Sequence, residues 1–443
     1  TSYARPKENV SQAPSSIVKT QVISDGNNIS TWIWNTGVFN QDLRTSNTPG
    51  FQWPKGSNKY AIFTSGLSMA AVVNNSLRLA SVSYSGEYGP GYILNGVPVT
   101  NSIFKLYKVS RGDNNNTNPD FANWGLMVPY GAPFDDINSN GVYDAGTDKP
   151  GIKNAVQTIF VCLTDGFPET HTSSEGFSGG TDPLNAEMHL TAWSYDNIAG
   201  LEDVQFLRME IINKNSSAWE KTHFGFVADP DLGDATDDYI GCDISRNLGY
   251  CYNSDDVDGT GAQSHYGVSP PAVGIDMLKG AINRNVTPNA DLYMTSFVFF
   301  SNGGPTVCET DPGSENIEAY NYLRGLKSDS TRFVNPVNMQ TTKYCYNGEP
   351  EANTGWTEYF GKVNNCGGDT TGSVVSSAPG DRRSVMGSGA SNLKIVPGEK
   401  QTFMFAQMVA RGTNNKNSVT KLKTLDDAVQ LFYDNNLSVG INQ

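Results

Sequence analysis

The segment QFLRMEIINKNSSAWEKTHFGFVADPDLGDATDDYIGCD, residues 205–243, decides the fold class. Its first part alternates, with Leu207, Met209 and Ile211 on one side and charged residues between them, which is typical of a half-buried strand. A turn-like NKNSS follows, and a second alternating run ends at Asp229. The segment therefore predicts a β-hairpin that presents an acidic loop at one edge of a sheet.

The acidic loop DPDLGDATDDYIGCD holds six aspartates within fifteen residues. Carboxylates this close raise one another's pKa unless a cation binds between them, and Ca²⁺ prefers about six to eight oxygen ligands. A solvated acidic loop is the alternative, although the interleaved glycines and Tyr239 favour a folded loop. The predicted Ca²⁺ ligands are Asp229, Asp231, Asp234, Asp237, Asp238 and Asp243.

A second calcium candidate is DDINSNGVYDAGTDKPG, residues 135–151. Its oxygen-bearing residues follow the first three quarters of an EF-hand loop, and Gly141 takes the sharp-turn position. Position twelve is Thr147 instead of glutamate, and no helix pattern flanks the loop. We therefore predict an EF-like calcium loop between strands; the alternative is a loop of Asx-turns without an ion. The predicted ligands are Asp136, Asn138, Asn140, Val142 (through its carbonyl), Asp144 and Asp148.

Composition favours short strands and many turns. The chain has 443 residues, 45 of them glycine, and 37% are hydrophobic. We predict an all-β protein, an antiparallel β-sandwich with long calcium-binding loops and one short C-terminal helix. The formal net charge of −14 argues against nucleic-acid binding, and no apolar run approaches the roughly 20 residues of a membrane span.

Three regions are expected along the chain. Residues 1–25 form an extended N-terminal arm, 26–125 an N-terminal β region, and 126–443 a β-sandwich region with the acidic loops, which is compatible with one continuous domain from residue 26 onward. The arm contains one possible strand and could add it to the sheet of a neighbouring subunit.

Individual elements are also expected. Asn74 and Asn75 predict the turn of a hairpin, and the nearly continuous apolar run 156–163 predicts a strand near the centre of a sheet. Thr424 and Asp427 stand at capping-box spacing, so the terminal helix is expected over residues 424–435.

The six cysteines are even in number and contain no CxxC pair, so disulfides in an exported protein fit better than zinc or redox use. Proximity in sequence suggests Cys242 with Cys251 and Cys345 with Cys366, which leaves Cys162 for Cys308. About fifteen connectivities are possible, and six reduced core thiols are the alternative.

No catalytic motif stands out. The four histidines occur in no HExxH or HxH arrangement, and GxSxG, Walker and GxGxxG signatures are absent. Glu187 and His189 would share one face of a strand, which alone is weak evidence for an enzyme. We expect no enzymatic activity. Trp32 and Trp34 lie two apart, a stripe more typical of a core than of a sugar-binding platform.

Specific motifs cover nearly the whole chain; in order they are NNISTWIWNTGVFNQDLRTSNTPGFQWP, YAIFTSGLSMAA, YGAPFDDINSNGVYDAGTDKPG, LTDGFPE, HLTAWSYD, ADPDLGDATDDYIGCD, LGYCYNSD, SPPAVG, GWTEY, PGDRRSVM and SVTKLKTLDDAVQLFYDNN. Together these motifs resemble, in the same order, those of large exported proteins of Bacteroidota-type bacteria that use type IX secretion.

The resemblance implies an extracellular, β-rich ectodomain that is followed by fibronectin-like modules and a C-terminal sorting domain. The family has no settled biochemical activity. This chain stops at Gln443 without a sorting domain, so we expect either a removed tail or a stand-alone subunit. In the family the DPDLGDATDDYIGCD motif recurs, which implies a structural ion site at Asp229, Asp231, Asp237, Asp238 and Asp243.

The expected function is that of an extracellular or cell-surface structural protein, stabilised by Ca²⁺. Its copies would assemble into a filament, sheath or layer, with the N-terminal arm as the candidate connecting element. One alternative is a carbohydrate-binding adhesin that stacks exposed tryptophan or tyrosine rings on sugars and bridges their hydroxyls with Ca²⁺; burial of Trp32, Trp34, Trp53 and Trp193 would count against it. The other is a secreted hydrolase, which would need a cleft with convergent acids.

Overall fold

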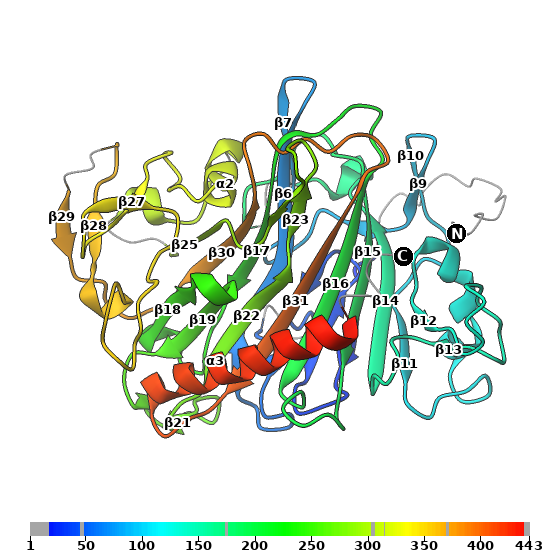
Figure 1. Ribbon diagram of the computed structural model, residues 1–443, viewed down its shortest axis with the longest axis horizontal. Coiled ribbons are helices and arrows are strands. Elements are labelled where there is room, and N and C mark those ends of the chain that lie inside the picture. The colour runs from blue at the N-terminus through cyan, green and yellow to red at the C-terminus, as the bar shows by residue number, and fades with distance from the viewer. Residues whose placement is uncertain are drawn as a thin grey trace.

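Two large antiparallel β-sheets stacked face to face form the core of the protein, so the predicted all-β, sandwich-like architecture is confirmed. The computed structural model describes residues 17–44, 48–172, 176–302, 306–313, 315–368 and 372–437. Helix α3 (Asn415–Phe432) lies across the front of one sheet, which adds a third layer (Figure 1).

Sheet one has eight strands and includes the second half of the segment that decides the fold. In order across the sheet the strands are β1 (Gln21–Ser24), β2 (Thr31–Trp34), β3 (Val38–Phe39), β6 (Thr64–Val73), β17 (Glu220–Asp229), β30 (Arg383–Gly389) and β25 (Ser296–Phe300), with β7 (Ser76–Ala80) paired to β6.

Sheet two has nine strands and includes the first half of that segment. In order they are β11 (Tyr107–Ser110), β14 (Gln157–Thr164), β15 (Ala186–Ser194), β16 (Val204–Asn213), β31 (Lys400–Ala410), β22 (Ala272–Lys279), β19 (Leu248–Asn253) and β18 (Asp238–Asp243), with β8 (Gly89–Pro90) paired to β14.

Short ribbons and helical turns connect the two sheets. The ribbons are β4 (Phe51–Gln52) with β5 (Tyr60–Ile62), β9 (Tyr92–Leu94) with β10 (Val97–Val99), β12 (Phe134–Asp135) with β13 (Lys149–Pro150), β20 (Val257–Asp258) with β21 (Gly267–Val268), β23 (Ala281–Asn283) with β24 (Ala290–Leu292), β26 (Phe333–Asn335) with β27 (Gln340–Thr342), and β28 (Lys362–Asn364) with β29 (Ser373–Val375). The remaining helical elements are α1 (Pro119–Ala122), α2 (Asn316–Leu323), the short 3₁₀ turns η1 (Trp124–Leu126), η2 (Val128–Tyr130), η3 (Pro168–Thr170), η4 (Ala235–Asp237), η5 (Ile244–Arg246), η6 (Val307–Glu309) and η7 (Glu358–Phe360), and the π-turn η8 (Tyr433–Leu437).

Aromatic pairs join the two sheets at the centre of the core. The ring of Phe224 on β17 lies 4.6 Å from that of Phe403 on β31, and the Phe226 and Phe405 rings are 4.7 Å apart. Such pairs contribute about 0.5–1.5 kcal/mol each beyond the apolar area they bury. The alternating side chains of β17 and β31 therefore fix how the sheets stack.

The predicted hairpin at the centre of the sequence is wrong. β16 pairs with β15 and β31 in sheet two, whereas β17 pairs with β6 and β30 in sheet one. The connection between them crosses from one layer to the other, where Trp219 is buried and exchanges backbone hydrogen bonds with Ile395. Alternation shows which face of a strand is buried, but not which strand lies beside it.

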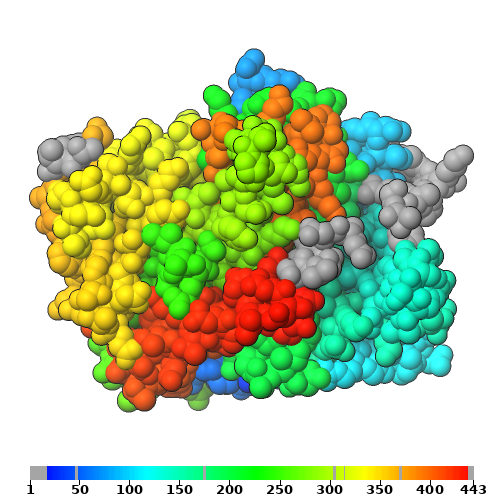
Figure 2. Space-filling view, viewed as in Figure 1, coloured from blue at the N-terminus to red at the C-terminus, as the bar shows by residue number. Residues whose placement is uncertain are grey.

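Helix α3 covers the outer face of sheet two, where Val419, Leu422 and Val429 pack into a cluster with side chains of β16, β19 and β31. Figure 2 shows the same helix as a red band along that face. The helix begins at Asn415, not at the predicted Thr424, because the side chain of Asn414 accepts the cap hydrogen bond from the Asn417 N–H. No helix in the described part of the chain is long and apolar enough to cross a membrane.

Two local predictions can be compared directly with the structure. The hairpin predicted at Asn74 and Asn75 is confirmed, since these two residues join β6 to β7 with φ of +50° and +65°. The 156–163 run forms β14 and is buried throughout, but it is second from the edge of its sheet instead of central. Its outer face is buried because η1 and η2 cover it; the Trp124 ring lies 6.3 Å from that of Phe160.

Within the predicted N-terminal arm, residues 21–24 form β1, which pairs with β2 at one edge of sheet one. Residues 1–16 of the arm lie outside the described residues. The division proposed at residue 125 falls between strands that pair with one another, since β6 pairs with β17 and β11 with β14.

A disulfide is present, as predicted, but the predicted cysteine pairings are wrong. Cys308 bonds to Cys366, and the other four cysteines are buried thiols. On the paired strands β18 and β19, Cys242 lies opposite Gly249 while Cys251 lies opposite Ile240. Diagonal positions of this kind are about 7–8 Å apart, which is too far for a disulfide.

Candidate metal-binding sites

The EF-like loop lies between β12 and β13, whose pairing places Phe134 opposite Pro150 and Asp135 opposite Lys149. The two-stranded ribbon closes the loop at its base, where an EF-hand would have two helices. The loop thus lies between strands, as the sequence indicates.

Asp136 organises the first half of this loop. Its carboxylate accepts hydrogen bonds from the Asn140 N–H (3.2 Å) and the Gly141 N–H (2.7 Å). Gly141 has φ of +75°, a backbone conformation that suits glycine at the sharp turn. The Asn140 side-chain oxygen in turn accepts from the Val142 N–H at 2.7 Å.

Asp144 and Asp148 close the second half. The amides of Asn138 and Asn140 donate to one oxygen of Asp144 at 2.9 and 2.6 Å, and these bonds lower its pKa. Asp148, which is buried, accepts from the Ile137 N–H (2.9 Å) and the Asp144 N–H (2.7 Å). One hydrogen-bonded network thus links all five predicted side-chain ligands.

The donor chemistry of this loop fits a hard divalent cation. Three carboxylates and two amides meet in a segment of thirteen residues, 136–148, that contains no lysine or arginine. An asparagine amide offers an oxygen as readily as a nitrogen after rotation about its last bond. Asp136, Asn138, Asn140, Asp144 and Asp148, with the Val142 carbonyl, could therefore hold Ca²⁺.

The aspartates of the second predicted site are divided among several places. Asp229 and Asp231 come together with Asp381, which precedes β30, and carboxylate oxygens of the three lie within 4.8 Å of one another. The sequence did not predict Asp381 as a ligand, although Asp381 belongs to the PGDRRSVM motif. The reason is distance along the chain, since Asp381 lies 150 residues after Asp231. Only the pairing of β17 with β30 brings the two segments together.

Asp229 is the most enclosed member of this triad. Its side chain is 4% exposed, and one of its oxygens accepts no hydrogen bond from any described residue. The other oxygen accepts a hydrogen bond from the Tyr84 hydroxyl, and Arg383 lies 3.7 Å from it. A buried carboxylate oxygen without a donor is costly unless a proton or a cation binds there.

The surroundings of the triad are negative. Arg383 is bonded to Asp381 at 2.9 Å and lies 3.7 Å from both Asp229 and Asp311, so one guanidinium pairs with three carboxyl groups. Burial, and after it Asp231, raises the pKa of Asp229. Burial, and after it Asp381, raises the pKa of Asp231 to about 7. The triad is therefore either partly protonated near neutral pH or neutralised by a bound cation.

Asp234 and Asp237 lie in a separate acidic group with Asp258. Asp258 accepts from the Asp234 N–H at 2.8 Å, and Asp237 accepts from the Asn253 amide (2.6 Å) and the Gly259 N–H (3.0 Å). Burial is the main cause that raises the pKa of Asp237 to about 6. Through these hydrogen bonds the carboxylates stabilise the backbone of the acidic turns.

Asp238 and Asp243 stand at opposite ends of β18 and serve different roles. Asp238 is buried and accepts from the Leu232 N–H at 2.9 Å; burial raises its pKa. Asp243 binds Lys423 of α3 at 3.1 Å and Arg246 at 2.9 Å. Although burial raises it, hydrogen bonds and these cations lower the pKa of Asp243 to about 2. The structure therefore does not bring the six aspartates to one point.

Three of the four tryptophans considered for sugar binding, Trp34, Trp53 and Trp193, are buried in the core. Trp32 is half-buried, and the guanidinium of Arg44 lies 4.2 Å from its ring centre. At these positions no tryptophan presents an open ring face of the kind that stacks on a sugar.

The chain matches no protein-family model and no curated protein.

Proposed function

We propose that this protein is an extracellular structural protein that binds Ca²⁺ and whose copies self-assemble into a filament, sheath or layer. The observation that supports it most directly is the loop 136–148, where five side chains with EF-like spacing form one network. The resemblance to exported proteins of type IX secreting bacteria agrees with it.

Bound Ca²⁺ would stabilise the conformation of the protein. Asp136, Asn138, Asn140, Asp144 and Asp148 would hold one ion in the first loop, and the Asp229, Asp231 and Asp381 triad would hold another. A divalent ion relieves the repulsion among the carboxylates and fixes loops that otherwise rest on hydrogen bonds alone.

The disulfide supports an oxidising environment. The Cys308–Cys366 bond closes a separation of 58 residues, a segment that contains α2, the β26–β27 ribbon, η7 and β28. Disulfides persist mainly outside the reducing cytosol, which agrees with an extracellular location.

Exposed apolar side chains support self-association. Tyr359, Phe360 and Val337, which are 72%, 51% and 50% exposed, line one surface groove in the part of the chain that carries the disulfide. Exposed apolar surface of this kind is typical of an interaction site. The edge strand β1, which follows the N-terminal residues, is a second place where another copy could add a strand.

Electron microscopy of the purified protein tests the proposal. We expect regular filaments or sheets in millimolar Ca²⁺ that come apart when a calcium chelator is added and re-form when Ca²⁺ is restored. A chain without residues 1–16, and a Tyr359→Ser, Phe360→Ser double variant, separate the two assembly surfaces. Isolated particles in every condition would refute self-assembly, and a glycan array would then test the adhesin alternative.

A further inference from the structure

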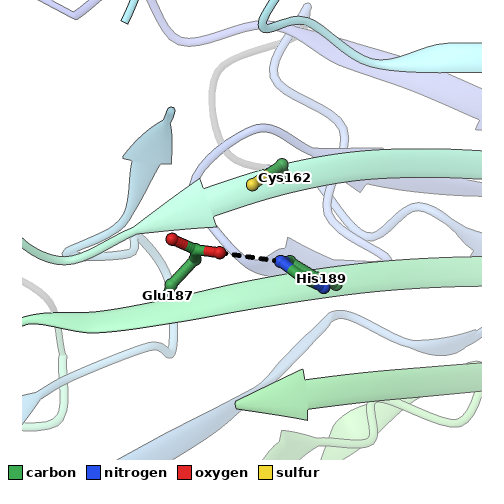
Figure 3. Close-up of side chains that lie close together, drawn as sticks. All are labelled: Cys162, Glu187 and His189. Atoms are coloured by element: carbon green, nitrogen blue, oxygen red, sulfur yellow. Dashed lines mark hydrogen bonds and ion pairs between the residues drawn. The ribbon is translucent and has the colours of Figure 1, made fainter. Parts of the chain in front are cut away.

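Cys162, Glu187 and His189 form a compact cluster on the outer face of sheet two, and none of them is among the calcium ligands considered above (Figure 3). Cys162 on β14 is the direct cross-strand partner of His189 on β15. Glu187 lies two residues before His189 on the same strand and therefore on the same face. Adjacent strands of one rigid sheet thus supply all three side chains.

The three side chains have ligand atoms close enough to share one ion. One sulfur, one imidazole nitrogen and one carboxylate oxygen all lie within 4.8 Å of one another. The His189 Nε2 is 2.9 Å from a Glu187 oxygen, and the Cys162 thiol donates to the Gly91 carbonyl at 3.2 Å. Zinc–ligand bonds of about 2.0–2.3 Å would place the ligand atoms roughly 3.5 Å apart, so modest side-chain rotation suffices.

A further set of charged side chains holds these ligands in place. Glu210, the cross-strand partner of His189 on β16, lies 3.7 Å from its Nδ1 and is itself bound by Lys400 at 3.0 Å. Histidines that bind a metal commonly direct their other nitrogen to a carboxylate, and Glu210 lies on that side of His189 at ion-pair distance. The second oxygen of Glu187 accepts from the Ile93 N–H at 3.2 Å.

The cluster is enclosed. Cys162 and Glu187 are 1% and 0% exposed, and Gly131, directly after η2, lies against the imidazole of His189. A Cβ at Gly131 would lie 2.2 Å from the His189 Nδ1, so only glycine allows this approach. The rings of Tyr92 and Phe104, 5.3 Å apart, belong to the apolar cluster that also contains Cys162.

We propose that Cys162, Glu187 and His189 bind a thiophilic divalent transition-metal ion of the Zn²⁺ class, which joins the neighbouring strands β14 and β15 on the outer face of sheet two. A thiolate with an imidazole and one carboxylate is a ligand set for zinc, not for Ca²⁺ or Mg²⁺, which take oxygen ligands. On binding, the thiol proton and any proton on the ligating nitrogen pass to the solvent while the sulfur and nitrogen lone pairs bind the ion.

Cobalt substitution tests the proposal, because Co²⁺ takes zinc positions and its bond to a thiolate gives a near-ultraviolet charge-transfer absorption. The whole chain is produced in Co²⁺-supplemented medium with its disulfide intact and then dialysed. We expect one tightly held Co²⁺ per chain together with that absorption, and its loss when Zn²⁺ displaces Co²⁺. No retained Co²⁺, or Co²⁺ without the thiolate absorption, overturns the proposal.

Variants assign the ligands. Cys162→Ser should abolish the thiolate absorption, whereas the matched change at another buried thiol, Cys242→Ser, should leave both the absorption and the stoichiometry unchanged. Glu210→Gln, which alters a positioning residue, should weaken Co²⁺ affinity by about 10–100-fold without removing the absorption. An unchanged Cys162→Ser spectrum would refute the site. If that variant does not fold, the spectrum of the unmodified chain decides.

Discussion

The carboxyl groups of Asp276 on β22 and Asp426 on α3 face each other at the interface between the helix and sheet two. Both residues are buried, and no described residue donates a hydrogen bond to either oxygen of Asp276. Burial, and after it the Asp426 charge, raises the pKa of Asp276, and burial is the main cause that raises that of Asp426 to about 7. A single proton shared between the two carboxyl groups gives each of them a hydrogen-bond partner.

This pair predicts that stability falls as the pH rises. Because the folded-state pKa of Asp426 is near 7 and the ordinary value is 3.8, the folded chain binds more protons between these values. The stabilising contribution is complete below pH 4 and is lost as the pH approaches and passes 7. We therefore expect Asp276→Asn to raise the free energy of unfolding at pH 8 by about 1–3 kcal/mol and to have less effect at pH 5.

Urea unfolding at pH 5 and pH 8 measures this difference. Asp427→Asn is the matched control, since Asp427 is the next residue on α3, is 60% exposed and pairs with Arg246 at the surface. That substitution should change stability by less than about 1 kcal/mol at both pH values. Equal effects of Asp276→Asn at pH 5 and pH 8 would contradict a shared proton.

For the triad of Asp229, Asp231 and Asp381, we predict that the Asp231→Asn substitution changes stability in opposite directions without and with Ca²⁺. Without Ca²⁺ at pH 8, Asp231→Asn should stabilise the protein by about 1–2 kcal/mol, because it removes the negative charge of a carboxyl group whose pKa is raised to about 7. In saturating Ca²⁺ the same substitution should be destabilising, since a ligand is lost. Thermal unfolding with and without Ca²⁺ measures both.

Asp243→Asn serves as the comparison for the triad. Its charge is stabilised by Lys423 and Arg246, and its pKa is lowered to about 2, so the substitution should destabilise with and without Ca²⁺. If Asp231→Asn behaved in the same way as Asp243→Asn, the triad would not be a cation site.

The loop 136–148 predicts that Ca²⁺ raises the thermal midpoint. At about a hundredfold excess over the dissociation constant the gain is roughly 2.7 kcal/mol. Asp136→Asn keeps an oxygen for the Asn140 and Gly141 N–H groups but removes a charge, so most of the gain from this loop should disappear. Asp182→Asn, at a side chain that is 82% exposed, should leave the gain intact, as differential scanning fluorimetry would show.

The cysteine arrangement predicts four thiols per chain. Titration with a thiol reagent in denaturant, without reductant, should find Cys162, Cys242, Cys251 and Cys345. Reduction of Cys308–Cys366, which closes a separation of 58 residues, should lower the free energy of unfolding by about 2–4 kcal/mol. A count near zero would instead support three disulfides.

The sequence by itself determined the features that depend on neighbouring residues. Period-two alternation identified the strands β16 and β17, a continuous apolar run identified β14, and the Asn74–Asn75 turn identified a hairpin, since all of these depend on local sequence and backbone geometry. The loop 136–148 was recognisable for the same reason, because all its candidate ligands lie within thirteen residues.

Only the tertiary structure decided which strands lie side by side, because a strand's buried face fits many possible neighbours. That choice sent β16 and β17 to different sheets and brought Asp381 to Asp229 and Asp231. It also placed Cys162 opposite His189, and the folding of the chain brought Cys308 to Cys366. Because the residues of each of these groups lie far apart along the chain, no local sequence pattern predicts them. They are brought together by strand pairing and by packing across the whole core.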